Sequence, residues 1–286
     1  MTKALAAESF SIAALLDAWE SSLRAVSELG KRLTPEQWEL PTECPGWSVG
    51  DIVRHCCWVE AMLAGRPLPE IEVDWDAYPH VQGAFQQLTE KGVVVRREHS
   101  QADVCTELDG LIDVRLAQLM AIEPLALDTP VTGLMGTPVP LVTMLRTRVF
   151  DAWTHEQDMR RATALPANMA SPGAQVSALM MLRSTGYLLA RSIEAPAGTT
   201  MRIRVSGPIA FERWAMVDDD LRGIDIDAGA AGDTAPTISL TTDWETYARL
   251  GAGRLDVEDP AVLALVRLEG DATLAARIPG ALAITP

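Results

Sequence analysis

The chain has 286 residues, of which 48% are hydrophobic and 22% are charged, so it can build ordinary cores and is not disordered overall. That length suits one large domain or two domains of medium size. Lys and Arg total 24 against 39 Asp and Glu, a formal net charge of −15, which argues against nucleic acid or anionic lipid as a partner.

The start of the chain lacks the basic region, apolar run and cleavage site of a secretory signal. Nowhere in the sequence is an apolar run long enough to span a bilayer. We therefore expect a cytoplasmic protein with no membrane partner, in which the four cysteines are mostly reduced. None of them forms a C-x-x-C pair, which argues against a structural zinc knuckle or a thioredoxin-like motif.

Apolar residues recur at helical spacings in the first part of the chain. The pattern predicts helices over residues 9–32, 49–64, 101–122 and 139–164. Ser48 is the expected N-cap of the second helix, and Asp51 stands three residues on as the acid of a capping box. Residues 65–80 contain three prolines and predict a long loop. Four helices with such connections favour an up-and-down bundle with one or two long connections.

The second part of the chain changes its period. A helix predicted over residues 171–194 bridges the two parts. Alternating apolar residues then predict strands over residues 200–206, 211–217, 223–227 and 236–240. Thr242 is the expected N-cap of a helix to about Leu250, and short helical patterns follow at 259–266 and 271–279. The fold class is therefore α+β: a helical bundle over residues 1–168 and a small α+β domain over 169–286.

An acid and a histidine share one face of the last predicted bundle helix. Asp151 lies four residues before His155. Both side chains lie on the same helix face as the apolar stripe that includes Val149 and Met159. A carboxylate and an imidazole aimed at a core must be paired or must bind a metal, because burying either alone is costly. The same spacing is also typical of a simple surface pair, so by itself it leaves both interpretations open.

The other histidines carry less information. His55 lies on the flank of the apolar stripe of helix 49–64, from which it can reach a facing helix, although a lone helical histidine is more often structural or exposed. His99 lies in a polar stretch and is expected at the surface. His80 follows Pro79 in the long loop, and nothing in the sequence requires it at a site.

Three segments of the chain together resemble the signatures of one known family. The run from Cys44 to His55, CPGWSVGDIVRH, resembles the first signature of the maleylpyruvate isomerase family, the mycothiol-dependent branch of the DinB-like superfamily. The run from Arg148 to Arg161, RVFDAWTHEQDMRR, resembles its second signature, an acid four residues before a histidine. The C-terminal stretches TTDWETYARLGAGR (241–254) and LEGD (268–271) resemble its sterol-carrier-like second domain. The likeness covers nearly the full chain in the same order.

The resemblance implies the site residues. It makes His55, Asp151 and His155 the ligands of one divalent metal, zinc or another, held in a DinB-like four-helix bundle. The usual acid of the family is Glu, and here the shorter Asp151 takes that position. The resemblance also implies that a C-terminal arginine enters the active site, and Arg254 is the candidate for this catalytic role. Its other interpretation is that of a helix-end cation near exposed carbonyls.

The implied activity is that of a mycothiol-dependent S-transferase or isomerase. Three protein ligands leave an open position on zinc, and a thiol bound there would lose its proton at neutral pH. The thiolate would then add to an electrophilic small molecule. Trp47, Trp58 and Trp153 are candidates to line the pocket, although core packing is the commoner use of tryptophan. Two alternatives stay open: a metal-dependent hydrolase using a metal-bound water, and a non-catalytic small-molecule-binding protein.

Overall fold

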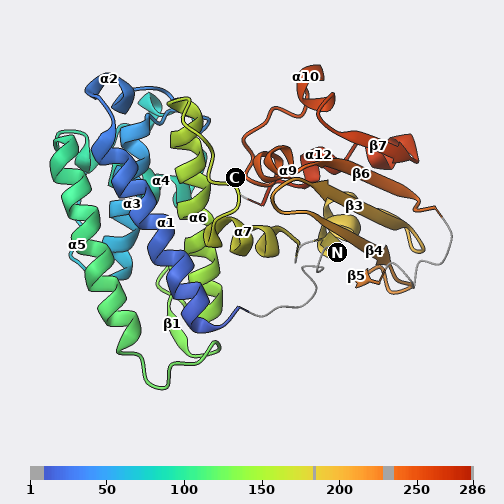
Figure 1. Cartoon of the computed structure of the whole chain (residues 1–286), viewed down its shortest axis with the longest axis horizontal. Helices are drawn as coiled ribbons and strands as arrows, with labels where there is room; N and C mark the ends of the chain where they lie inside the picture. Colours follow the sequence, from blue (N-terminus) through green and yellow to red (C-terminus); the bar gives the residue numbers. More distant parts are fainter. Residues whose placement is uncertain (1–9, 183–184, 228–234, 285–286) are drawn as a thin grey trace. The chain divides into compact units, whose positions relative to one another are not determined.

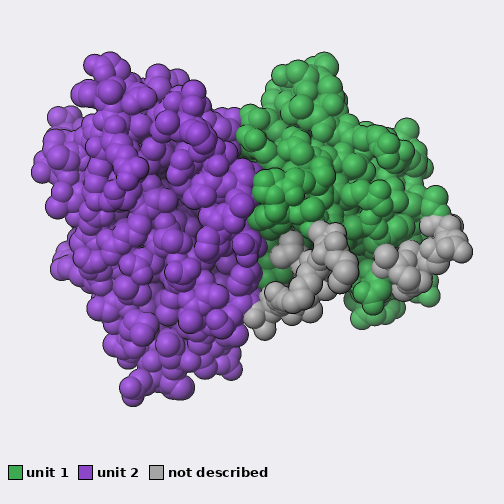
Figure 2. Space-filling model, viewed as in Figure 1, with its two compact units in different colours: residues 1–9, 177–286 green, residues 10–176 purple. Residues whose placement is uncertain are grey.

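The computed structural model describes residues 10–182, 185–227 and 235–284. The chain divides into two compact units (Figure 2). Residues 10–176 form the helical unit, and the described residues from 177 onward form the sheet unit. The sequence placed the boundary between residues 168 and 169, before helix α7 (Pro172–Leu182), whereas the two units divide inside that helix.

The helical unit contains the expected bundle (Figure 1). Its four long helices, each within two or three residues of its predicted range, are α1 (Ile12–Arg32), α3 (Val49–Leu63), α5 (Gln101–Met120) and α6 (Leu141–Ala162). Residue 9 of the first predicted helix lies outside the described residues. The prediction of a bundle followed by a strand-rich part is confirmed.

Four shorter elements of the helical unit connect these helices. They are α2 (Pro35–Trp38), the 3-10 turn η1 (Trp75–Ala77), α4 (Ala84–Arg96) and the hairpin of β1 (Pro130–Thr132) with β2 (Pro138–Pro140). The sequence analysis missed α4, which packs against α3. Its Gly92 makes this contact close, since a Cβ built there would lie only 2.0 Å from Cγ of Trp58.

Helix α3 is the central helix of the unit. It packs against α1, α4, α5 and α6, and every residue from Val49 to Ala61 is buried. The predicted capping box begins it, because the Ser48 hydroxyl accepts from the Asp51 N–H while the Asp51 carboxylate accepts from the Ser48 N–H. Polar side chains on such a helix must find partners inside the protein, which makes His55 and Glu60 informative.

The sheet unit is built on a five-stranded sheet of order β5-β4-β3-β6-β7. Its strands are β3 (Thr200–Ser206), β4 (Phe211–Val217), β5 (Gly223–Ile226), β6 (Ile238–Asp243) and β7 (Arg267–Gly270). The central pair, β3 and β6, is parallel, and the other pairs are antiparallel. Its helices are α8 (Thr185–Tyr187), η2 (Leu188–Ser192), α9 (Trp244–Gly251), α10 (Pro260–Leu263), α11 (Ala272–Ala275) and α12 (Ile278–Ala281).

Several local predictions for this unit need correction. Strand β7 was not predicted. Helix α9 is capped by Asp243 rather than Thr242, because the Asp243 side chain accepts from the Thr246 N–H. The predicted helix 171–194 is instead α7, α8 and the π-helical turn η2, with residues 183 and 184 outside the described part. Among the described residues, no helix combines the length and the apolar character needed to cross a membrane.

Candidate metal centre

The turn before α3 shapes one wall of the site. The Thr42 hydroxyl donates to the Trp47 carbonyl and accepts from the Cys44 N–H, which closes the turn on itself. Gly46 adopts φ +77°, in the left-handed region that favours glycine. A Cβ at Gly46 would also lie 2.3 Å from Cε1 of His80, so both the backbone and its neighbour require glycine here.

His55, Asp151 and His155 converge as predicted. His55 Nε2 lies 3.4 Å from Asp151 Oδ2, and His155 Nε2 lies 3.7 Å from Asp151 Oδ1. The two imidazole centroids are 4.9 Å apart. Each of the three residues offers one donor atom, and these atoms all lie within 4.8 Å of one another. One face of α6 thus supplies two donors, and α3 supplies the third from across the bundle.

The donor set fits a divalent metal. A tetrahedral zinc ion with ligands at about 2.0–2.1 Å separates those ligand atoms by about 3.3 Å, close to the 3.4 Å between His55 Nε2 and Asp151 Oδ2. Both histidines are buried, and the ring nitrogens of His55 make no well-formed hydrogen bond to any residue in the described ranges, with Asp151 Oδ2 lying 3.4 Å from Nε2. A buried polar group without a partner costs about 1–3 kcal/mol, and a bound cation would supply the missing partner.

The ionisation of the ligands suits a metal as well. Burial lowers the pKa of His55, although the carboxylate of Asp151 acts in the opposite direction. Burial alone would raise the pKa of Asp151, but the charge of Arg148 and the two histidines hold it well below its usual value. A neutral imidazole and an ionised carboxylate are the states in which these side chains bind metals.

Asp158 orients His155. Its Oδ2 lies 3.2 Å from His155 Nδ1, which leaves Nε2 facing Asp151. A carboxylate behind a ligand histidine fixes its tautomer and its ring orientation. Oδ1 of Asp158 accepts from Arg161 at 2.7 Å, and Arg161 in turn pairs with Glu43 at 2.8 Å. Asp158, the third acidic residue of the RVFDAWTHEQDMRR run, therefore lies behind the candidate ligands rather than among them.

Cys44 joins the same network. Its thiol donates to Asp158 Oδ2 at 3.3 Å, and its sulfur lies 3.8 Å from His155 Nδ1. Cys44, His155 and Asp158 form a second group whose donor atoms lie within 4.8 Å of one another. The oxygens of Asp158 are already engaged by Arg161, His155 and the thiol, so the group containing His55 is the better metal centre. No disulfide joins the four cysteines, all of which lie within the described residues.

Trp47 packs on the two ligand histidines. Its ring centroid lies 4.8 Å from that of His55 and 5.8 Å from that of His155. The indole N–H donates to Oε2 of the buried Glu90 at 2.7 Å, and His80 Nε2 lies 3.1 Å from the same oxygen. His80 thus belongs to the surroundings of the site, which its place in a proline-rich loop did not reveal. His99 is exposed, as expected.

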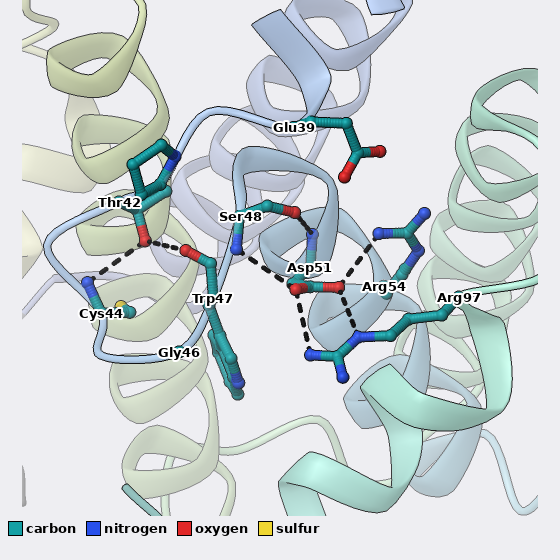
Figure 3. A pocket seen from close by; sticks show the side chains of 10 residues that line it. Glu39, Thr42, Cys44, Gly46, Trp47, Ser48, Asp51, Arg54 and Arg97 are labelled. Carbon is teal, nitrogen blue, oxygen red and sulfur yellow. Dashed lines mark hydrogen bonds and ion pairs between the residues drawn. The ribbon is translucent and has the colours of Figure 1, made fainter. Parts of the chain in front are cut away.

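A pocket of about 440 Å³ lies beside the centre (Figure 3). Cys44 and Trp47 belong to its wall, and Figure 3 shows Asp51 between the guanidinium groups of Arg54 and Arg97. Of the three tryptophans considered for a pocket, only Trp47 lines this one. Trp58 and Trp153 are almost completely buried, which fits the core-packing alternative.

Arg254 lies in the sheet unit, directly after Gly253, which adopts φ +67° at the end of α9. Its Nη1 donates to the Ala252 carbonyl at 2.8 Å and its backbone N–H to the Arg249 carbonyl at 2.8 Å. These contacts are those of a residue closing a helix. The catalytic role expected for Arg254 stays a prediction.

Sequence comparison identifies the relatives of this fold and site. The family model of the mycothiol maleylpyruvate isomerase N-terminal domain matches residues 18–160, half of the chain. The chain belongs to the mycothiol maleylpyruvate isomerase family. The three candidate ligand residues, and Asp158 behind them, fall within the matched segment. Among curated proteins, none shows significant sequence similarity to the chain.

Solved structures extend the family likeness to the fold of the whole chain. The crystal structure of the mycothiol-dependent maleylpyruvate isomerase is similar with a TM-score of 0.55 and 10% identity. A histidine-to-alanine variant of that isomerase is similar with a TM-score of 0.54 and 10% identity. Each comparison covers 86% of this chain and 90% of the other. The likeness spans both parts of the fold, so this member of the mycothiol maleylpyruvate isomerase family has the family's α+β architecture.

Proposed function

We propose that the protein is a metal-dependent enzyme that adds mycothiol to an electrophilic small molecule, by S-transfer or by thiol-assisted isomerisation. The observation that carries the proposal is the convergence of the donor atoms of His55, Asp151 and His155 within 4.8 Å of one another. Membership of the family supports the thiol as cosubstrate. Zinc is the proposed metal, because two imidazoles and a carboxylate with a further open position form a common catalytic zinc set.

The chain's own residues divide the work around that centre. Bound zinc would supply the positive charge that lowers the pKa of a coordinated thiol. Asp158 holds the Nδ1 proton of His155, so that Nε2 faces the centre. Trp47 covers both imidazoles on one side and keeps water from them. Cys44 and Glu43 connect the turn before α3 to α6 through Asp158 and Arg161, which holds the wall of the site in place.

The proposed function requires both a bound metal and mycothiol. We expect purified protein to contain about one zinc per chain by elemental analysis, as a site with three protein ligands implies. We expect it to convert an electrophile such as maleylpyruvate only when mycothiol is present. Removal of the metal with a chelator should abolish turnover, and added zinc should restore it.

The same assay separates the alternatives. Turnover that needs metal but no thiol would contradict the proposal and favour a hydrolase with a metal-bound water. Metal-free protein without turnover would favour a binding protein. A second thiol, such as glutathione, serves as the control for cosubstrate identity.

Arg254 is proposed as a catalytic residue that binds an anionic substrate group. Replacing Arg254 by Met should lower thiol-dependent turnover at least about tenfold, since a charge-assisted hydrogen bond is worth about 1.5–3 kcal/mol. The zinc content should not change, because the arginine is not a ligand. Arg267→Met is the matched control, since Arg267 is an exposed cation of the sheet unit, on β7. Equal turnover in both variants would contradict a catalytic role.

A further inference from the structure

A buried ion pair connects the two helices that carry the metal ligands. Arg148 on α6 donates through Nε to Glu60 Oε1 on α3 at 2.9 Å, and through Nη1 to Asp151 Oδ2 at 2.6 Å. Arg148 and Glu60 are 1% and 0% exposed, so both charges are withdrawn from water. The three charges alternate in the order Glu60, Arg148, Asp151, and each carboxylate faces a different edge of one guanidinium.

We infer that Arg148 is a positioning residue of the metal centre, an inference that rests on the metal-dependent function proposed above. It holds the carboxylate of Asp151 through Oδ2 and ties α6 to α3 through Glu60. His55 stands on α3, five positions before Glu60, and Asp151 and His155 stand on α6. A single side chain therefore sets both the direction of the carboxylate and its distance from His55.

Arg148 holds the carboxylate of Asp151 from within the same helix. Arg148 lies three residues earlier, on the same face of α6, and its guanidinium reaches one carboxylate oxygen directly. The charge-assisted hydrogen bond to Oδ2 therefore limits the rotation of the carboxylate that faces His55 and His155.

The geometry requires arginine rather than a generic cation. Two different nitrogens of Arg148 contact two carboxylates on different helices. The single ammonium of lysine is a point charge and does not reproduce that planar, two-edged arrangement. Substitution by lysine therefore keeps the charge of the site and removes the link between α3 and α6.

A neighbouring arginine provides a matched control. Arg115 on α5 is also buried, and its Nε lies 3.8 Å from Glu60 Oε2. It shares the carboxylate of Glu60 with Arg148, but no contact is described between it and Asp151. If Arg148 serves only to neutralise Glu60 in the core, lysine at either position should have similar consequences.

The experiment compares zinc affinity of Arg148→Lys, Arg115→Lys and wild-type full-length protein. Apoprotein competes with a chromophoric chelator for zinc, and circular dichroism verifies folding. We expect Arg148→Lys to bind zinc about 10–100-fold more weakly, as is typical for residues behind metal ligands. Arg115→Lys should stay within about threefold of wild type, since it leaves Asp151 untouched. Cobalt in place of zinc adds a spectroscopic readout, because its visible bands respond to the arrangement of the ligands, which should change when Asp151 is no longer held by Arg148.

Each outcome has a distinct meaning. Folded Arg148→Lys with the zinc affinity and cobalt spectrum of wild type would overturn the role of Arg148 alone. Wild-type protein that binds no zinc would overturn the proposed metal centre, and the role of Arg148 with it. If Arg148→Lys does not fold, Glu60→Gln takes its place, because it keeps the bond to Asp151 and removes the anchoring charge on α3. Unchanged zinc affinity and cobalt spectrum in folded Glu60→Gln would then overturn the inference.

Discussion

Replacing His155 by alanine is expected to abolish high-affinity metal binding and thiol-dependent turnover. His155 supplies one of the three donors, and its loss also leaves the buried carboxylate of Asp158 without one of its hydrogen bonds. Two remaining ligands do not hold zinc tightly, since catalytic zinc sites use three protein ligands. Zinc per chain, measured by elemental analysis after dialysis, should fall from about one to near zero.

His99→Ala is the control for this experiment. His99 is exposed and lies outside the network around the site, so its variant should keep zinc and activity. Thermal unfolding of both apoproteins separates loss of a ligand from loss of fold. Unchanged zinc content in folded His155→Ala would refute the ligand assignment.

Asp158→Asn should weaken zinc binding by about 10–100-fold while the fold persists. The amide has nearly the shape of the carboxylate, but it is a weaker acceptor for the N–H of His155 and no longer fixes the imidazole tautomer. Arg161 also loses one of its two ionic partners and keeps Glu43. Chelator competition measures the affinity, and the midpoint of thermal unfolding shows whether stability has changed.

The far end of the same network provides the comparison for Asp158. Glu43 pairs with Arg161 but has no described contact with His155. Glu43→Gln should therefore change zinc affinity by less than about threefold, as expected for an ion pair that is only partly buried. Similar losses in Asp158→Asn and Glu43→Gln would show that the network acts through general stability and not through the orientation of His155.

Regular apolar patterns made most of the helical unit predictable. Long amphipathic helices such as α1 bury a continuous stripe, and that stripe is visible in the sequence. Helix α4 was not predicted from the sequence because it contains Gly92 followed by three valines, a composition that does not favour a helix. Its helical state depends on close packing against Trp58, a tertiary contact that local sequence does not report.

The contacts of the candidate site also divide into some that the sequence predicts and others that it does not. Helical spacing placed Asp151 beside His155, because residues four apart share a helix face whatever the rest of the chain does. Only the family resemblance joined His55 to them. The contacts between distant segments behind the candidate ligands could not be predicted, since Cys44 is 114 residues from Asp158 and Glu60 is 88 from Arg148. Such pairs depend on how the helices pack, and no periodicity encodes them.

The hydrogen-bond network around the centre has a consequence for substitutions elsewhere in the chain. The three ligands and the described partners behind them lie between Glu43 and Arg161, inside the helical unit. The described side chains of the sheet unit supply no metal ligand. Substitutions in the sheet unit therefore leave the candidate metal ligands and their described partners unchanged. On this view the metal centre is a property of the helical unit alone.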